Sequence, residues 1–347
     1  MKPIIYIVCA LWIGVAHTQN LYQTTFNDFA QALQGKQAMS FKAAVFATEN
    51  AYFEGNLDKN EFEKTIGFLS ALCVSYRKAN TQPSYTKSDK ATIETLGAIF
   101  KVVTDTTTII LPDKQAVYHY PFQYDFEDVF GHKNWSNMSV TKLLATHKGN
   151  CHSLPYLYKI LCENLNTPCH LALAPNHIYI KHRAERGGMY NTELTSAAFP
   201  IDAWLMASGY IPLEAVQSGI YLDTLSEKQS LALCVLDLAQ GYKQKYTDSD
   251  GHFIIECCDL TLQYFPNCVN AMLLKAETLL AQIQKIQTQK DLKTIQEAGK
   301  TAEAKANYKA MNALYGKILQ LGYRQMPEQM YVDWLVSLKT ERAKYTK

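Results

Sequence analysis

The hydrophobic pattern of this chain changes character twice, and that change constrains the fold more than any other feature. Residues 19–101 and 223–347 carry apolar side chains at the three- and four-residue spacing of amphipathic helices. Residues 102–222 contain β-branched runs, most of the histidines and a Gly-Gly turn. A switch from helical to strand texture and back is typical of an α+β protein. We therefore expect an α+β core over 102–222, an N-terminal helical segment before it and a C-terminal helical region after it.

Composition narrows the class of protein. The chain has 347 residues, 48% of them hydrophobic, which is enough for a well-buried core and more than one structural unit. Aromatic residues make up 12%, which argues against disorder. The formal net charge is only +2, so nothing indicates a nucleic-acid-binding surface.

The N-terminus has the pattern of an export signal. Lys2 precedes an apolar run from Ile4 to Val15, and small residues follow at Gly14-Val15-Ala16. The run is shorter than the ~20 residues needed to span a bilayer, although an uncleaved anchor is the alternative. We expect residues 1–18 to be a signal peptide and the mature protein, secreted or periplasmic, to have no membrane span.

Eight cysteines remain if Cys9 is removed with the signal peptide. Cys162 and Cys169 lie on either side of a tight turn, so we expect their Cα atoms within the ~7 Å that a disulfide requires. Connectivity cannot be read from spacing, and most of the cysteines are expected to pack as small hydrophobic residues.

The C-terminal region resembles irregular tetratricopeptide-type helical hairpins. Leu260–Pro266 leads into Ala271–Ala276 with proline at the turn, and Ile318–Tyr323 before Pro327 repeats that layout. The resemblance implies a surface for a protein partner. An all-helical bundle that merely packs is an equal alternative.

A candidate nucleophile lies in the central stretch, where Gly149-Asn150-Cys151 leads directly into an apolar stripe of helical spacing. The stripe consists of Leu154, Leu157, Tyr158, Leu161, Cys162 and Leu165. Cys151 therefore lies at a helix N-terminus with Asn150 as its cap, and the helix dipole lowers the pKa of a thiol at that place. Gly149 allows close approach of another backbone or of a substrate.

A candidate base and acid follow. His177 opens an alternating strand after Pro175-Asn176, and a turn at Glu185-Arg186-Gly187-Gly188 returns the chain. In this hairpin His177 lies opposite roughly Thr195, with Glu193 as a diagonal neighbour. A thiol at a helix start, a base on a strand and an acid beside the base form the arrangement that cysteine nucleophiles require.

These residues resemble the transglutaminase-like superfamily, which shares the papain-type Cys-His-acid core. The resemblance implies Cys151 as nucleophile, His177 as base and Glu193 as acid, although the family more often has an Asp there. Asp202 is the backup acid, and Asn191 is an alternative orienting amide.

We accordingly expect a papain/transglutaminase-like cysteine core that performs acyl transfer or amide hydrolysis on a peptide or protein through a Cys151 thioester. The alternative is a catalytically inactive envelope scaffold that binds peptides or proteins. Tyr120, Gln123 and Trp135 are candidates to line the cleft or to donate to an oxyanion. No Cys-x-x-Cys, His-Glu-x-x-His or phosphate-binding glycine motif occurs, so we expect no metal and no cofactor.

Overall fold

The computed structural model describes residues 20–247 and 249–345. It is 57% helix and 10% strand, which confirms the expected α+β class at that level. The chain divides into two compact units. Unit 1 contains the described residues up to Leu57 together with Glu227–Tyr323, and unit 2 contains Asp58–Ser226 together with the described residues from Arg324 onward.

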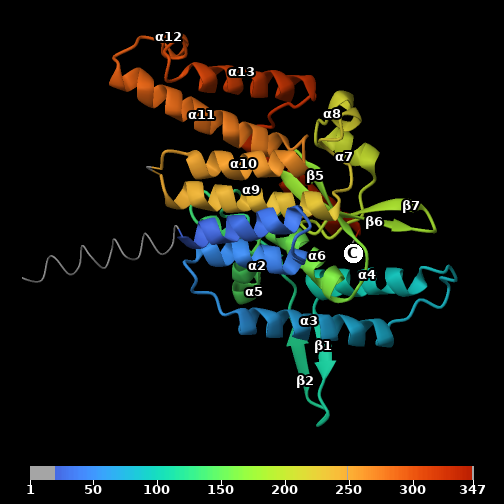
Figure 1. The fold of residues 1–347 in the computed structure, drawn as a ribbon. Helices are drawn as coiled ribbons and strands as arrows, with labels where there is room; N and C mark the ends of the chain where they lie inside the picture. Colours follow the sequence, from blue (N-terminus) through green and yellow to red (C-terminus); the bar gives the residue numbers. More distant parts are fainter. Residues whose placement is uncertain (1–19, 248, 346–347) are drawn as a thin grey trace, which may run out of the picture. The chain divides into compact units, whose positions relative to one another are not determined.

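Unit 1 is entirely helical in its described part. A helix over residues 20–33 is followed by α2 (Phe41–Tyr52), α9 (Glu227–Lys245), α10 (His252–Tyr264), α11 (Val269–Gln289), α12 (Ile295–Ala298) and α13 (Lys305–Gln320). Contacts run from α2 to α9, then to α10, α11 and α13, so consecutive helices pack against one another (Figure 1). Tyr22 of the first helix is fully buried and meets Tyr242, Tyr246 and Phe253 edge-on, which anchors the N-terminal segment to α9 and α10.

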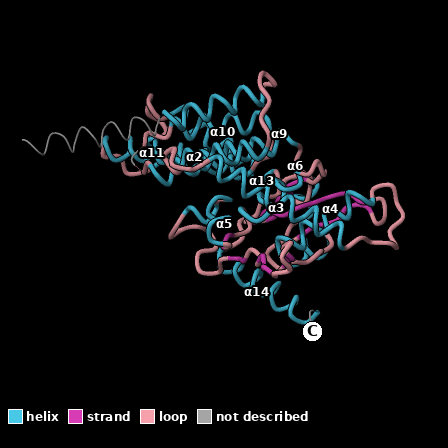
Figure 2. The backbone as a smooth tube through the Cα atoms, turned by 90° about the horizontal axis from the view of Figure 1, so that it is seen from below, coloured by secondary structure: helices cyan, strands magenta, loops and turns pink. Residues whose placement is uncertain are grey.

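Unit 2 holds every described strand, drawn in magenta in Figure 2. Its helices are α3 (Lys59–Ala79), α4 (Lys90–Thr104), η1 (Trp135–Met138), α5 (Val140–Thr146), α6 (Ser153–Asn164), α7 (Asp202–Ser208), α8 (Leu213–Gln217) and α14 (Glu328–Tyr345). Its strands are β1 (Thr107–Ile110), β2 (Ala116–His119), β3 (Gln123–Tyr124), β4 (Lys148–Gly149), β5 (His170–Ala174), β6 (His177–Ala184) and β7 (Gly188–Thr192).

An antiparallel sheet of order β5-β6-β7 forms the centre of unit 2. The β6–β7 register pairs Ala184 with Gly188 and Lys181 with Asn191, which confirms the hairpin expected from the sequence. Helix α6 contacts β5 and β6 as well as α3, α4 and α5, and its side chains from Ser153 to Cys162 are all buried. The helix that follows the candidate nucleophile is thus the central core helix of the unit.

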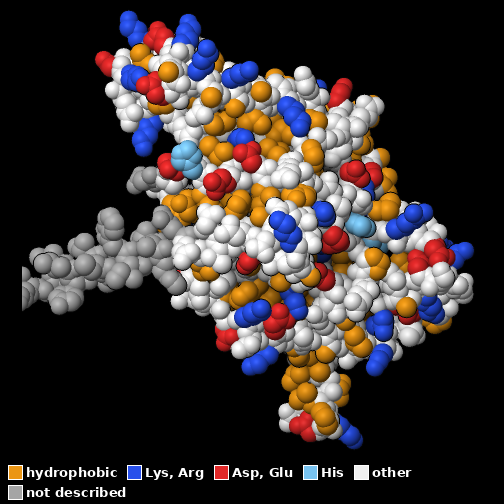
Figure 3. Space-filling view, in the orientation of Figure 1, with side chains coloured by type: hydrophobic (Ala, Val, Ile, Leu, Met, Phe, Trp, Pro, Cys, Tyr) orange, Lys and Arg blue, Asp and Glu red, His pale blue; other side chains and the backbone are white. Residues whose placement is uncertain are grey.

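The β1–β2 hairpin is the most exposed apolar element of unit 2. Ile110 is 65% and Tyr118 is 56% exposed, and Figure 3 shows orange side chains over the projecting hairpin. Neither strand pairs with a third strand among the described residues.

The turn between α6 and β5 is tight, as the positions of Cys162 and Cys169 on either side of it predict. Asn166 has φ +49°, and the Thr167 N–H donates to the Cys162 carbonyl over 2.8 Å, as in a Schellman motif with asparagine in the usual place of glycine. Cys162 and Cys169 are free thiols, and Cys169 lies close enough to help raise the pKa of Cys162. The two residues are thus neighbours, as expected, without a disulfide.

The structure agrees with some of the predicted segments and differs from others. Both flanking regions are helical, as predicted, but Val102-Val103-Thr104, read as a β-branched run, is the buried last turn of α4. The compact units do not follow the consecutive stretches 19–101, 102–222 and 223–347, because residues from Asp58 and residues from Arg324 both join the central sheet's unit. The predicted signal peptide 1–18 lies outside the described residues. Among the described residues, no helix is long and apolar enough to cross a membrane.

Candidate active site

The loop before α6 is held in a fixed shape by its own residues. The Asn150 side chain accepts from the backbone N–H groups of His152 and Ser153 over 3.0 and 3.3 Å, and Ser153 Oγ accepts from the Asn150 N–H over 3.0 Å. This reciprocal capping satisfies N–H groups that a helix start leaves unpaired. The Asn150 amide also donates to the Val129 carbonyl over 3.2 Å, so the fully buried cap is tied to the rest of the unit.

Gly149 is required by packing at this loop. A Cβ at Gly149 would lie 2.3 Å from Ser153 Oγ and 2.9 Å from a methyl group of Leu143. The close approach that the sequence predicts at Gly149 is therefore made by Ser153, the serine that caps this loop.

Cys151 lies two residues before Ser153, the first residue of α6, and so just before the helix N-terminus, as predicted. The Leu154 N–H already donates to the Asn150 carbonyl over 3.2 Å, so helical hydrogen bonding begins one residue before Cys151. The Cys151 backbone N–H has no hydrogen-bond partner among the described residues and remains available to a ligand. Cys151 is only half-buried, whereas every other cysteine in the described part of the chain is buried.

His177 is brought to Cys151 by a two-residue turn. Ala174 pairs with His177, so the turn consists of Pro175 and Asn176, and Asn176 has φ +56°, a conformation that asparagine tolerates. The Cys151 thiol lies 3.5 Å from the Asn176 carbonyl oxygen, and it interacts with the His177 imidazole closely enough to shift the pKa of both groups.

Glu193 completes the chain of contacts, as predicted. It follows the end of β7, where the Glu193 and Ala198 backbones exchange hydrogen bonds of 2.9 and 3.0 Å. Its Oε2 is hydrogen-bonded to His177 Nε2, and its Oε1 accepts from the Thr195 N–H over 2.7 Å. His177 and Glu193 are both buried.

The three groups shift one another's proton affinities. Burial lowers the pKa of His177, but the charges and hydrogen bonds of Glu193 and Cys151 outweigh it and raise that pKa to about 10. Burial raises the pKa of the Cys151 thiol, yet the hydrogen bond and charge of His177 hold it below its usual value. Burial likewise raises the pKa of Glu193, and His177 lowers it overall. The three shifts together favour the thiolate, imidazolium and carboxylate forms over the neutral ones.

Helix α14 adds two aromatic residues that the sequence analysis did not assign to the site. The Tyr331 hydroxyl lies 2.8 Å from His177 Nδ1, and its interaction with Cys151 helps to lower the pKa of that thiol. Trp334 meets the His177 ring edge-on at 5.0 Å between centroids. The Asn176 amide donates to the Met326 carbonyl over 3.1 Å and ties down the segment that leads into α14.

Tyr124 is a further residue missed from the sequence. It lies on β3, which pairs in parallel with β4 and so runs beside Gly149. Its buried hydroxyl interacts electrostatically with Cys151 and Tyr331 but has no well-aligned hydrogen bond. Burial raises the pKa of Tyr124, so the phenol keeps its proton and can donate. The Cys151 N–H and the Tyr124 hydroxyl are thus two unused donors near one sulfur.

The backup acid lies elsewhere. Both Asp202 oxygens lie 2.9 Å from Lys181 Nζ, and Asn191 donates to Asp202 over 2.7 Å. Asp202 and Asn191 therefore belong to a lysine cluster, and among the described residues His177 has only Glu193 as an acid partner.

The other sequence candidates take peripheral places. Tyr120 is 63% exposed, Gln123 is exposed, and Trp135 is half-buried in η1. None of the three makes a described contact with Cys151, and their neighbour Tyr124 occupies the position expected of them. His152 contacts the Met138 carbonyl over 2.9 Å, and its charge helps to lower the pKa of Cys151.

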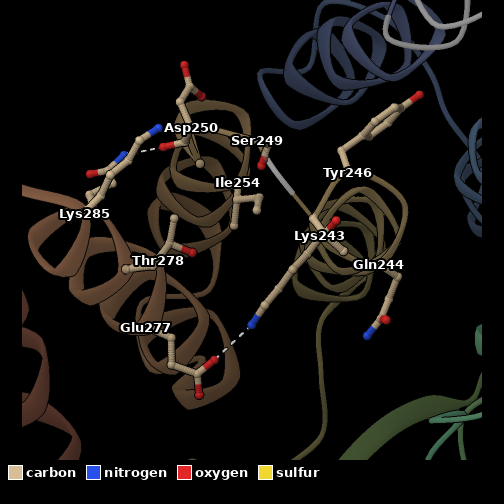
Figure 4. A pocket seen from close by; sticks show the side chains of 13 residues that line it. Lys243, Gln244, Tyr246, Ser249, Asp250, Ile254, Glu277, Thr278 and Lys285 are labelled. Atoms are coloured by element: carbon tan, nitrogen blue, oxygen red, sulfur yellow. Dashed lines mark hydrogen bonds and ion pairs between the residues drawn. The ribbon is translucent and has the colours of Figure 1, made fainter. Parts of the chain in front are cut away.

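The described residues contain no group of three or more His, Cys, Asp or Glu side chains that could hold a metal ion. Unit 1 has a cavity of about 410 Å³ between α9, α10 and α11 (Figure 4). Lys243 reaches Glu277 across it at 3.1 Å, and Gln282 donates to the Asp250 carbonyl over 2.7 Å. The central polar groups of this cavity are already paired with one another.

Comparison with known proteins adds little. No protein family matches the chain, and no curated protein matches it. Among solved structures it is similar to a crystal structure of menin that is described as revealing the binding site for Mixed Lineage Leukemia (MLL) protein. The identity is 11% and the TM-score 0.31, with 92% of this chain and 88% of that chain covered. A similarity of that size carries no conclusion about the fold or activity of this chain.

Proposed function

We propose that this protein is an exported cysteine acyltransferase or amidase of transglutaminase-like type, with Cys151, His177 and Glu193 as its catalytic residues. The observation that carries the proposal is that His177 is hydrogen-bonded to Glu193 and, at the same time, interacts with the Cys151 thiol so that the pKa values of both groups shift. Three separate elements supply these side chains, and a series in which the thiol pKa falls while the imidazole pKa rises is typical of a nucleophilic cysteine.

The chemistry follows from the different roles of the two imidazole nitrogen atoms. The Cys151 thiolate attacks an amide carbonyl carbon, and the Cys151 N–H with the Tyr124 hydroxyl provides donors for the oxyanion that forms. His177 gives its Nδ1 proton to the leaving amine as the carbon–nitrogen bond breaks, which leaves a thioester on Cys151. Water or a second amine then loses a proton to His177 and attacks the thioester, releasing an acid or a new amide and restoring the thiolate.

Glu193 orients the base during both steps. Its carboxylate holds His177 Nε2, so Nδ1, which lies 2.8 Å from the Tyr331 hydroxyl, is the nitrogen left to exchange a proton with the thiol. The Thr195 N–H fixes the other carboxylate oxygen. Glu193 therefore acts through His177 and stabilises the imidazolium that the first step consumes.

The second candidate function is a catalytically inactive scaffold that binds peptides or proteins. One observation favours it: the His177 side chain has no solvent exposure, because Tyr331 and Trp334 of α14 lie against it. A scaffold of this kind would use the cleft, or the helices of unit 1, for recognition alone.

One assay separates the two candidates. The purified protein is incubated with casein and dansylcadaverine, a fluorescent primary amine, and both amine incorporation and ammonia release are measured. The proposal predicts one or both products, lost in Cys151→Ala and reduced in Glu193→Gln. Lys181→Gln serves as a matched control, since it removes a neighbouring buried charge that does not contact His177.

Equal product from wild type and Cys151→Ala would contradict the acyl-transfer proposal. Binding of casein by both proteins, with no product from either, would support the scaffold instead.

A further inference from the structure

Unit 2 also has a cavity, and none of the residues assigned to acyl transfer lines it. It has a volume of about 360 Å³ and lies between α4, α6 and the β6–β7 hairpin. His182 lines it, five residues after His177 in β6, and side chains alternate between the two faces of a strand. The cavity is therefore on the face of β6 opposite to His177.

The walls of this cavity are aromatic and apolar. Phe100 and Phe199 meet with ring centroids 4.6 Å apart, and His182 stacks on Tyr190 at 5.7 Å with an interplanar angle of 12°. Burial lowers the pKa of His182 to about 4, so its ring is neutral at physiological pH.

The phenol groups of the lining are satisfied outside the cavity. Tyr158 donates to the Leu96 carbonyl over 2.9 Å, Tyr190 donates to the Arg186 carbonyl, and Tyr85 donates to Asp89 over 2.8 Å. Because these hydroxyls are paired with protein groups, the lining offers ring surface to a ligand. The interior favours a planar apolar group.

The rim carries one free positive charge. Arg186 lines the cavity, is exposed, and makes no ion pair with any described residue. The two nearby carboxylates are engaged elsewhere: Asp89 accepts from Tyr85 and from the Glu185 N–H over 2.9 Å, and Glu185 accepts from Ser88. Arg186 can therefore pair with an anion held at the mouth of the cavity.

We propose that this cavity is a binding site for a small aryl carboxylate, with the ring between the aromatic walls and the carboxylate on Arg186. The volume lies within the ~300–1,000 Å³ of small-molecule sites. The proposal does not depend on the acyl-transfer chemistry, because the cavity shares no residue with the Cys151–His177–Glu193 series.

The test compares an acid with its neutral isostere on the full-length protein. Binding of 4-phenylbutyrate and of 4-phenylbutyramide is measured by isothermal titration calorimetry. We expect the acid to bind at least tenfold more tightly than the amide. Arg186→Gln should reduce the acid to the affinity of the amide, whereas Arg183→Gln, an exposed arginine of the same hairpin outside the cavity, should leave both unchanged.

A filling substitution tests the cavity itself. Gly97 lines it, and a Cβ there would meet no atom within 4 Å, so the first atom of a Gly97→Leu side chain is accommodated and the rest of it takes up space in the cavity. We expect this variant to weaken the acid at least tenfold. Gly67→Leu is the matched control, being an exposed helical glycine with equally open surroundings in α3, and should bind as wild type does.

Equal affinity of wild type for acid and amide would overturn the assignment of Arg186. Unchanged binding in Gly97→Leu would overturn the site, and circular dichroism of each variant confirms that the fold is intact.

Discussion

The pKa of His177 is raised and that of Cys151 is lowered, so the two residues contribute in opposite directions to the pH dependence of stability. His177 has a raised pKa in the folded protein, so its contribution is complete below its unfolded value of ~6.5 and is lost as pH rises toward about 10. Cys151 has a lowered pKa, so its contribution is present above its unfolded value of ~8.5 and is lost as pH falls. Where the two pH ranges overlap, the two slopes have opposite signs and offset each other.

Cys151→Ser should therefore make stability depend on pH. Serine does not titrate in this range, but Glu193 still holds a charged His177, so only the histidine slope remains. We expect the free energy of unfolding of the variant to fall by up to about 1.4 kcal/mol per pH unit above pH 6.5, relative to wild type. Urea titrations of both proteins at pH 6.5, 7.5 and 8.5 measure this difference. Parallel behaviour of the two proteins would argue against a charged His177.

Tyr331→Phe tests the hydroxyl that α14 brings to the sulfur. The Tyr331 hydrogen bond is one of the interactions that lower the pKa of Cys151. Removing it should raise that pKa, although less than His177→Ala does, because the imidazolium charge remains. Ultraviolet absorbance of the thiolate as a function of pH gives the comparison. A Cys151 pKa that is unchanged by Tyr331→Phe would show that the hydroxyl does not stabilise the thiolate.

The sequence indicates the residues of the site that are close together along the chain and not those that are distant. Cys151, His177 and Glu193 follow one another through a helix and a hairpin, so local periodicity is enough to relate them. Tyr331 and Trp334 reach the same imidazole from the far end of the chain, after the whole of unit 1. A single sequence carries no signal for that return, although the aromatic i, i+3 spacing after Pro327 indicates a buried helix face.

At the scale of elements, the loop from β4 to α6 sets the position of the nucleophile. Its shape rests on the reciprocal hydrogen bonds of Asn150 and Ser153 and on the missing side chain at residue 149. A larger residue 149 must displace Ser153 Oγ, which is the acceptor of the Asn150 N–H.

Gly149→Ala should therefore destabilise unit 2 and disturb the nucleophile together. We expect a loss of about 1–3 kcal/mol in the free energy of unfolding, as for overpacking, and slower alkylation of Cys151. Gly67→Ala is the control, because its Cβ meets nothing within 4 Å in α3 and it should stabilise by about 0.5–1 kcal/mol. Chemical denaturation compares the three proteins. A neutral effect of Gly149→Ala would show that the loop can open at no cost.

Elements with a strong periodic pattern could be predicted, and those decided by packing could not. The α6 stripe has the bounds that its periodicity indicates, and the β6–β7 hairpin forms as predicted, although its second strand ends at Thr192 and not at Thr195. Val102-Val103-Thr104 has strand propensity, but Val102 and Val103 are buried on the inner face of α4, so tertiary packing overrides the local preference.

At the scale of the whole molecule, the chain builds each unit from two separate segments. The helix over residues 20–33 and α2 join α9 and α10 in unit 1, while α14 returns to unit 2. Domain boundaries placed along the sequence assume consecutive segments, which is why the composition change near residue 101 does not coincide with a unit boundary.

Tyr22→Ala tests this division. Tyr22 is fully buried against three aromatic rings of unit 1, and its loss should cost about 3–5 kcal/mol there. Every residue of the candidate site belongs to unit 2, so the alkylation rate of Cys151 should remain at the wild-type value. Hydrogen exchange of α9 and α10 amides reports the first effect. Simultaneous loss of Cys151 reactivity would mean that the site depends on unit 1.

The other described cysteines are all buried, so the reaction of the native protein with a thiol reagent reports on Cys151. Cys73, Cys162, Cys257, Cys258 and Cys268 are buried, and burial raises the pKa of each. Cys169 and Cys234 are buried as well. Among the described cysteines, only Cys151 combines partial exposure with a lowered pKa, so a thiol reagent applied to the native protein should label it selectively.

The thiolate–imidazolium pair is tested by the rate of Cys151 alkylation by iodoacetamide as a function of pH, followed by mass spectrometry of the Cys151 peptide. We expect an inflection below the ~8.5 of an ordinary thiol, and a shift of that inflection to higher pH in His177→Ala. The matched control, His182→Ala, removes a histidine of the same strand that does not contact the thiol and should leave the inflection in place. An inflection at the ordinary thiol value, unchanged in His177→Ala, would contradict the thiolate–imidazolium pair and with it the proposed chemistry.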